Sequence, residues 1–236
     1  MNHFLVIGAG GIGYHLVEPL VRFLNYQQTE WCVTVVDGDT VETGNLSRQH
    51  VSSAVGRNKA EVLAETVNQR IDPKNPVQFI ARFLSPGTVV DSRFSSLIKS
   101  GVTFFVCVDN NATRVFVEQL CCSLNSAAMI SGGNDEYRGQ AQLFVRSKGK
   151  NMTPLPSEVN PEILDLDQFP DEIGCDQQVV SEPQLIFTNN MVASSMLNLW
   201  FSQIWRSDTK TRVNEVCTNI IAASAFPYDR KSLVSS

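Results

Sequence analysis

The first thirteen residues carry the pattern that most limits the possible folds of this chain. An apolar run at residues 4–7 leads directly into GAGGIG at residues 8–13, and a segment with apolar residues on one face follows through about Leu24. A short apolar run bounded by glycine is typical of a buried parallel strand. Glycines spaced G-x-G-x-x-G between a strand and a helix are typical of a nucleotide-binding loop. The sequence therefore predicts the strand, loop and helix that open a Rossmann-like fold.

Apolar runs and helix-like segments continue to alternate as far as residue 145. Such alternation implies right-handed crossovers and an α/β fold, in which a mostly parallel sheet has helices on both faces. Strands are expected at 31–36, 77–83, 102–108, 127–130 and 140–145, and helices at 55–71, 94–98 and 112–125.

Residues 146–183 interrupt this alternation. They contain five of the ten prolines and show no clear periodicity, which predicts a long, irregular excursion over the surface. A helix is expected next at 183–205, followed by one or two closing strands at 213–225. We therefore expect antiparallel strands toward the C-terminal end, and a single domain over residues 1–236.

The composition fits a folded protein and narrows the classes of partner. Hydrophobic residues make up 43% of the 236 residues and charged residues 18%, which is enough apolar material for a full core. A net charge of −5 provides no basic field, so we expect no nucleic-acid partner. None of the six cysteines belongs to a C-x-x-C pair, so the sequence offers no zinc-ribbon ligand set.

The sequence also predicts a cytoplasmic protein without a membrane partner. The N-terminus enters its first strand within three residues and lacks the charged region and long apolar run of a signal peptide. No apolar stretch reaches the roughly 18 residues of a membrane span. Five cysteines lie in apolar strand-like or helix-like runs, as expected for core cysteines of a reducing compartment: Cys32, Cys107, Cys121, Cys122 and Cys217.

Acidic residues follow the second expected strand. Asp37 lies 24 residues after Gly13, where a carboxylate can bridge the ribose hydroxyls of NAD or of adenosine equally well. Asp39 is a second candidate for the ribose. Asp37, Gly38 and Asp39 are also good turn residues, so a purely structural turn is the alternative.

Cations, amides and a further carboxylate follow the same strand and the fourth one. Arg48 can hold phosphate oxygens in a bidentate manner, and Lys59 offers a point charge, which together suit a triphosphate better than a pyrophosphate bridge. The fourth strand delivers Asp109 and Asn110 at the edge of the sheet where ligands gather, and a carboxylate beside a triphosphate is well placed for Mg²⁺. Taken singly, Arg48 and Lys59 suit a solvated surface, and Asp109-Asn110 suits a turn that caps the next helix.

Four segments in this order resemble one family. GAGGIG, VVDGDTVETGNLSRQ, VGRNKAE and VDNNATR, spread over residues 4–145, are similar to the ThiF/MoeB/HesA family and to the adenylation domains of ubiquitin-activating enzymes. The resemblance implies one ThiF-type adenylation domain, ATP and Mg²⁺ as cofactors, and a ubiquitin-like or sulfur-carrier partner with a Gly-Gly C-terminus. Members of the family are usually homodimers or heterodimers.

The resemblance also implies roles for individual residues. The carboxylate of the partner would attack the α-phosphate of ATP, and pyrophosphate would leave. Because the nucleophile is already an anion, no protein base is needed, and catalysis depends on positioning and charge neutralisation. The implied nucleotide ligands are Gly8, Gly10, Gly11 and Gly13 in the loop, Asp37 at the ribose, Asn45, Arg48, Gln49 and Lys59 at the phosphates, and Asp109, beside Asn110, at Mg²⁺.

The chain departs from the family pattern in two respects. Bacterial members carry a segment before the first strand whose arginine reaches the ATP site of the partner subunit, whereas here no arginine precedes Arg22. The two C-x-x-C zinc pairs of many relatives are also missing. Three alternatives follow: another arginine substitutes, a partner protein supplies one, or catalysis is weak.

Cys175 lies in the excursion, where many relatives place a cysteine that forms a thioester or a persulfide. It stands in DEIGCDQQ, before the segment that resembles the late helix of the family. The functional interpretation makes Cys175 the nucleophile that receives the adenylated C-terminus. The alternative is a loop or packing cysteine, since neighbouring carboxylates raise a thiol pKa and no histidine or lysine lies nearby in sequence.

Three other functions remain open at the level of sequence. The first is adenylation of another group, such as a tRNA base substituent or a peptide amide. The second is a nucleotide-binding pseudoenzyme that acts as the scaffold subunit of an activating complex. The third is an NAD-dependent oxidoreductase, for which the chain has no evident catalytic His or Lys–Tyr pair.

Overall fold

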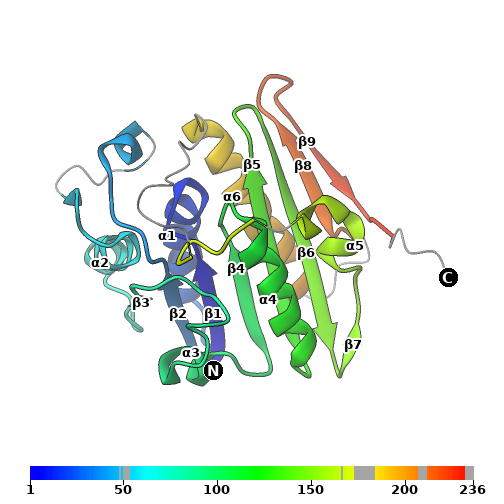
Figure 1. The fold of residues 1–236 in the computed structure, drawn as a ribbon, viewed down its shortest axis with the longest axis horizontal. Helices are drawn as coiled ribbons and strands as arrows, with labels where there is room; N and C mark the ends of the chain where they lie inside the picture. Colours follow the sequence, from blue (N-terminus) through cyan, green and yellow to red (C-terminus); the bar gives the residue numbers. More distant parts are fainter. Residues whose placement is uncertain (48, 50–53, 166, 173–183, 207–211, 232–236) are drawn as a thin grey trace.

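The computed structural model describes residues 1–47, 49, 54–165, 167–172, 184–206 and 212–231. Within these residues a nine-stranded sheet has the order β3-β2-β1-β4-β5-β6-β8-β9, and β7 pairs with β6 (Figure 1). The strands are β1 (Asn2–Ile7), β2 (Trp31–Val36), β3 (Gln78–Ile80), β4 (Val102–Val106), β5 (Ala127–Asn134), β6 (Arg138–Ser147), β7 (Lys150–Asn151), β8 (Glu215–Asn219) and β9 (Ser224–Tyr228). The helices are α1 (Gly11–Asn25), η1 (Thr43–Ser47), α2 (Lys59–Ile71), α3 (Ser92–Leu97), α4 (Asn111–Ser123), α5 (Pro156–Val159), η3 (Pro161–Leu164), α6 (Ile186–Trp200) and η5 (Phe201–Trp205).

The sheet has a parallel half and an antiparallel half. β1 pairs in parallel with β2 on one side and with β4 on the other, and β3 and β5 extend this parallel half outward. From β5 onward the neighbours β6, β8 and β9 are antiparallel. The predicted Rossmann-like fold, with antiparallel strands toward the C-terminal end, is therefore confirmed.

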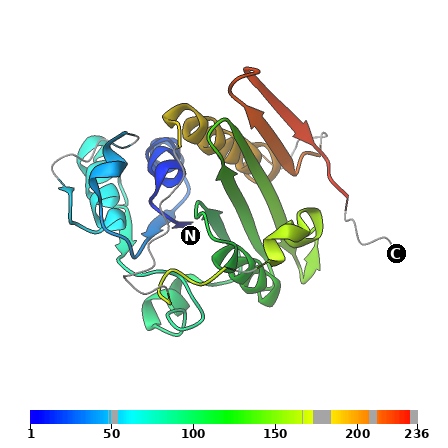
Figure 2. The ribbon, with the colours of Figure 1, turned by 45° about the horizontal axis from the view of Figure 1, so that its top comes forward.

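Alternate side chains of β1 point into two different helical layers. Phe4 and Val6 pack into a cluster built with α1, α2 and α6, whereas Leu5 and Ile7 pack into a cluster built with α3 and α4. All four side chains are buried. The strand is apolar without alternation because both of its faces are covered (Figure 2).

Glycines let α6 approach the sheet closely. A Cβ atom on Gly139 of β6 would overlap the Val192 side chain, and one on Gly132 of β5 would lie 2.9 Å from that side chain. Since α6 also packs along α1, it brings the C-terminal half of the chain next to the glycine loop. None of the described helices is both long and apolar enough to cross a membrane.

Some element boundaries differ from those expected. The helix predicted at 55–71 begins only at Lys59, because the Asn58 side chain accepts a hydrogen bond from the Glu61 N–H and caps the helix there. The strand predicted at 77–83 is limited to Gln78–Ile80. The excursion expected at 146–183 contains short ordered elements, namely β7, α5 and η3.

Candidate functional site

The glycine loop joins β1 to α1, and two of its glycines are required by packing. Gly8 has φ +97°, and a Cβ atom there would lie 2.7 Å from the carbonyl oxygen of Cys107. A Cβ atom on Gly13 would overlap the carbonyl oxygen of Gly8. The loop therefore folds back on itself where β1, β4 and α1 meet, as a tight phosphate-binding turn requires.

The N-terminus of α1 is open to an anion. Its N-cap residue is Gly10, which has no side chain that could cap the helix, and no acidic residue lies in the first turn. A Cβ atom on Gly10 would meet nothing within 4 Å. Free backbone N–H groups and the positive end of the helix dipole favour a phosphate at such a terminus.

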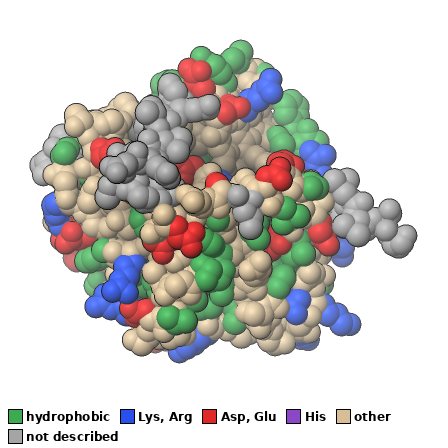
Figure 3. All heavy atoms as spheres, viewed as in Figure 1, with side chains coloured by type: hydrophobic (Ala, Val, Ile, Leu, Met, Phe, Trp, Pro, Cys, Tyr) green, Lys and Arg blue, Asp and Glu red, His purple; other side chains and the backbone are tan. Residues whose placement is uncertain are grey.

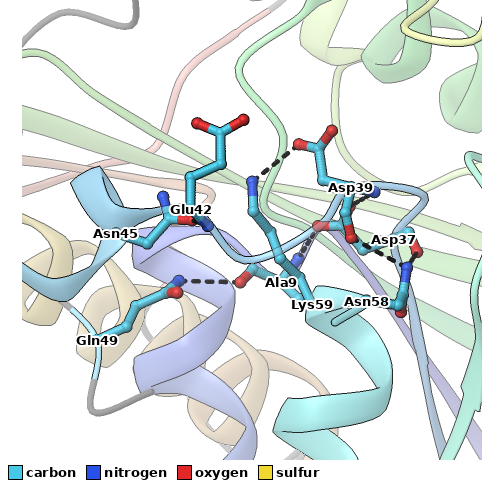
Figure 4. Close-up of polar contacts among 8 residues, drawn as sticks. All are labelled: Ala9, Asp37, Asp39, Glu42, Asn45, Gln49, Asn58 and Lys59. Atoms are coloured by element: carbon cyan, nitrogen blue, oxygen red, sulfur yellow. Dashed lines mark hydrogen bonds and ion pairs between the residues drawn. The ribbon is translucent and has the colours of Figure 1, made fainter. Parts of the chain in front are cut away.

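Asp37 ties the end of β2 to this loop. Its Oδ2 accepts a 2.6 Å hydrogen bond from the Ala9 N–H, and its Oδ1 accepts a 2.8 Å bond from the Asp39 N–H (Figure 4). The side chain is only 8% exposed, and this burial raises the pKa of its carboxyl group above the usual value. Each carboxylate oxygen has a second lone pair, so the same group can also accept from ribose hydroxyls.

Asn45 and Gln49, both predicted to contact phosphates, are buried and bonded to backbone. The Asn45 Oδ1 accepts from the Glu42 N–H at 2.9 Å, and the Gln49 Nε2 donates to the Ala9 carbonyl at 3.0 Å (Figure 4). Gln49 therefore contacts the glycine loop, whereas the Asn45 amide bonds within its own turn at η1. Arg48, the third residue of this set, lies outside the described residues.

Lys59 forms an ion pair with Asp39 at the start of α2. The Nζ–Oδ2 distance is 2.9 Å, and the lysine side chain is 13% exposed against 55% for the aspartate. Asn58 holds the turn that carries Asp39 in place, because its Nδ2 donates to the carbonyl oxygens of Asp37 and Asp39. Sequence reasoning missed Asn58 as a site residue, although an asparagine just before a helix is a recognisable N-cap signal.

The end of β4 carries Asp109 and Asn110 to the same edge of the sheet. The Asn110 Oδ1 accepts from the Thr113 N–H at 2.8 Å and caps α4, as the turn interpretation expected. Asp109 is exposed in the loop between β4 and α4. The described residues contain no group of three or more His, Cys, Asp or Glu side chains able to hold a metal. A single carboxylate instead fits Mg²⁺ held jointly with nucleotide phosphates.

Arg114 is a partly buried cation that holds this loop in place. It donates to the Ser131 Oγ at 2.6 Å, the Val108 carbonyl at 2.5 Å and the Gly132 carbonyl at 2.9 Å, and burial lowers its pKa. It therefore joins the end of β4 to β5 directly behind Asp109. In the sequence, Arg114 is the final arginine of VDNNATR, and the pattern predicted no role for it.

A cavity of about 460 Å³ is lined by residues of β5, β6, β8 and β9. One lining residue, Gly133, lies close to Arg114, since a Cβ atom on Gly133 would lie 3.0 Å from the Arg114 Nη2. The cavity continues between the β5–β6 turn and the β8–β9 hairpin, past Gly139 and Phe226. Figure 3 shows acidic side chains around a hollow in the upper part of this face.

Part of the excursion crosses the carboxyl edge of the sheet. Asp167 accepts from the N–H groups of Asn111 and Ala112 at the start of α4, and Asp171 accepts from the Ser85 hydroxyl at 2.6 Å. Between them, Phe169 packs edge-on against Phe116 of α4. Cys175, the predicted nucleophile, follows shortly after and lies outside the described residues.

A family model for the ThiF family matches residues 1–222 of this sequence. The chain belongs to the ThiF family. This membership confirms the predicted family and agrees with the order of the glycine loop, β2 edge and β4 edge described above.

Two curated relatives of this ThiF chain are subunits of activating enzymes. The chain is 30% identical over 154 residues to the NEDD8-activating enzyme E1 catalytic subunit of Caenorhabditis elegans, which covers 59% of this chain and 33% of that protein. It is 31% identical over 149 residues to SUMO-activating enzyme subunit 2 of Dictyostelium discoideum, and this match covers 61% of this chain and 20% of that protein. The match thus spans a third or less of either relative.

Solved structures show the same fold. E. coli MccB in complex with ATP superposes with a TM-score of 0.69 at 19% identity, over 100% of this chain and 66% of that one. PaaA superposes with a TM-score of 0.68 at 16% identity, over 97% of this chain and 64% of that one. The architecture is therefore that of known ThiF-like proteins.

Proposed function

We propose that this protein uses ATP and Mg²⁺ to adenylate the C-terminal carboxylate of a ubiquitin-like or sulfur-carrier protein, with release of pyrophosphate. The observation that carries the proposal is the placement of three groups at one edge of the sheet. The uncapped N-terminus of α1 follows β1, Lys59 stands beside the end of β2, and Asp109 follows β4. Because β1 lies between β2 and β4, the loop is flanked by the lysine and the carboxylate.

Each part of the nucleotide has a matching group in this arrangement. We assign the ribose to Asp37, whose carboxylate lies at the base of the glycine loop. The phosphates would meet the N–H groups of α1 and the Lys59 ammonium, with Arg48, Asn45 and Gln49 from the segment after β2. Asp109 would hold Mg²⁺, which when bound neutralises phosphate charge.

The chemistry that follows needs little from the protein beyond position and charge. The incoming carboxylate and the α-phosphate are both anions, so their approach is opposed by charge repulsion. The helix N-terminus and Lys59 offset that repulsion, and the backbone bonds of Asp37 and Asn58 hold the segments that carry them. The carboxylate forms its bond to the α-phosphorus, and the bond to pyrophosphate breaks.

We assign the cavity between the β5–β6 turn and the β8–β9 hairpin to the C-terminal tail of the protein substrate. Gly133 of the cavity lies close to Arg114, which donates to the Val108 carbonyl beside Asp109, so an extended tail in the cavity would point toward the proposed α-phosphate position. A tail ending in Gly-Gly fits this assignment because it carries no side chains next to the reacting carboxylate. The two curated relatives are named as subunits of enzymes that activate NEDD8 and SUMO. We propose the corresponding role for this protein, as one subunit of a homodimer or heterodimer.

We further propose that Cys175 accepts the activated carboxyl group as a thioester. In that step the thiolate sulfur bonds to the carbonyl carbon and AMP leaves. The segment with Asp167 and Asp171 supports this assignment, because it leads the chain over the carboxyl edge only a few residues before Cys175.

Two measurements test the proposal. In calorimetric titrations we expect the protein to bind ATP–Mg and not NADH. With a candidate carrier protein ending in Gly-Gly, it should exchange labelled pyrophosphate into ATP, and Asp109→Ala should abolish the exchange. Exchange that survives Asp109→Ala would remove the metal assignment. Binding of ATP without exchange, with any carrier, would instead favour the scaffold-subunit alternative.

A further inference from the structure

The side chain of Asn189, in the first turn of α6, is buried without a hydrogen-bond partner. Its exposed fraction is 0%, and neither its Nδ2 nor its Oδ1 has a partner within the described part of the chain. A buried amide with both polar ends unpaired is costly, and native proteins rarely retain one without a reason.

This amide packs directly against the glycine loop. A Cβ atom on Gly11 would come within 2.7 Å of the Asn189 Cγ and 2.9 Å of its Oδ1, and would overlap Nδ2. Only a glycine at position 11 leaves room for the amide. α1 and α6 pack side by side on the same face of the sheet (Figures 1 and 2).

Two helix N-termini meet at this contact. α1 and α6 each have 15 residues, and neither N-cap, Gly10 or Leu185, makes a side-chain capping bond. Neither helix has an acidic residue in its first turn. Two positive helix ends therefore lie next to an amide that has no partner among the described residues, a combination that favours a bound anion.

We propose that Asn189 is a positioning residue for phosphate binding, whose amide becomes hydrogen-bonded to the glycine loop when a nucleotide phosphate occupies the N-terminus of α1. The flexibility of Gly10 and Gly11 allows the loop to turn its peptide groups toward the amide. The amide then gains the partner it lacks in this structure, and the free energy of that bond adds to ligand affinity. The inference rests on the proposed function only for the identity of the ligand.

The test compares two neighbouring asparagines of α6. Asn189→Leu removes the amide at nearly constant size, and Asn190→Leu makes the same change at an exposed position of the same turn. Without nucleotide, Asn189→Leu should unfold at the same or a higher temperature than wild type, since an unpaired buried amide is gone. Its Kd for ATP–Mg should rise on the order of tenfold, whereas Asn190→Leu should keep both wild-type values.

Other probes separate this inference from the adenylation proposal. A wild-type Kd for Asn189→Leu overturns the role of Asn189 and leaves adenylation standing. If wild type binds inorganic pyrophosphate or NADH but not ATP–Mg, and Asn189→Leu loses that binding, the role stands and adenylation fails. Wild-type protein that binds none of the three overturns both. Should Asn189→Leu not fold, Asn189→Ala takes its place with the same readouts.

Discussion

The carboxylate of Asp37, at the end of β2, accepts a 2.6 Å hydrogen bond from the backbone N–H of Ala9 in the glycine loop after β1. The bond joins neighbouring parallel strands at the edge where the nucleotide site is proposed. Burial of Asp37 raises its pKa, while the N–H groups of Ala9 and Asp39 act in the opposite direction. The balance between these effects has a measurable consequence for stability.

We predict that Asp37 makes the protein less stable as the pH rises above about 4. In the folded protein its pKa lies above the usual value of an aspartate, so the native state binds this proton more tightly than the unfolded chain does. The contribution of Asp37 to stability therefore falls through the window between the two pKa values. Urea unfolding of wild type and Asp37→Asn from pH 4 to pH 8 should show the wild type losing stability relative to the variant. A relative gain instead would mean that the backbone bonds outweigh burial.

Two glycines of the loop should respond differently to alanine. Gly13→Ala places a Cβ atom onto the Gly8 carbonyl, so we expect several kcal/mol of destabilisation or failure to fold. Gly10→Ala meets no atom within 4 Å, so stability should change by less than about 1 kcal/mol. Its methyl group would stand at the proposed phosphate site, and the Kd for ATP–Mg should rise. Equal loss of stability in both variants, measured by thermal unfolding, would contradict this account of the loop.

Lys59 should matter for nucleotide binding far more than for stability. Its partner Asp39 is 55% exposed, and such ion pairs contribute at most about 1 kcal/mol. Lys59→Met should therefore unfold close to wild type but bind ATP–Mg at least ~10-fold more weakly, as expected for a lost bond to a charged group. Lys74→Met, at an exposed position, is the control. Unchanged calorimetric affinity in Lys59→Met would exclude the proposed phosphate contact.

Arg114 should be a structural residue of the Asp109 loop. Arg114→Met leaves the Ser131 hydroxyl and the carbonyls of Val108 and Gly132 without their donor, which we expect to cost about 3 kcal/mol. Arg93→Met, on the exposed surface of α3, should cost less than about 0.5 kcal/mol. Urea unfolding compares the two. A loss as small as that of Arg93→Met would show that the hydrogen bonds of Arg114 are dispensable for stability.

The buried thiol of Cys107 should resist alkylation in the native protein. Burial raises its pKa to about 12, so almost no thiolate is present at pH 8. We expect iodoacetamide to leave Cys107 unlabelled in the folded protein and to label it fully in urea, as read by peptide mass spectrometry. The half-buried Cys32 serves as an internal comparison. Rapid native labelling of Cys107 would indicate that the β4 edge opens frequently.

The sequence by itself predicted the parallel half of the sheet because its signals are local. The run at residues 4–7 and the glycines at 8 and 13 specify a strand and a tight turn through burial and backbone conformation alone. The apolar stripe on α2 is also a local signal, although the sequence predicts too early a start for this helix. The helix begins only after Asn58, because the side chain of Asn58 accepts a capping bond there. Hydrophobic periodicity in the sequence does not reveal such a bond. The residues of the proposed nucleotide site were likewise predicted from their order along the chain.

The tertiary structure decided which of those residues are paired and which are not. Lys59 forms an ion pair with Asp39, and Asn110 caps a helix. Arg114 spans β4 and β5, and Asn189 is brought onto Gly11 from 178 positions away in sequence. Hydrogen bonds and close contacts between distant segments depend on how helices dock on the sheet. Local sequence patterns specify the elements, whereas long-range packing specifies the contacts that give each polar group its role.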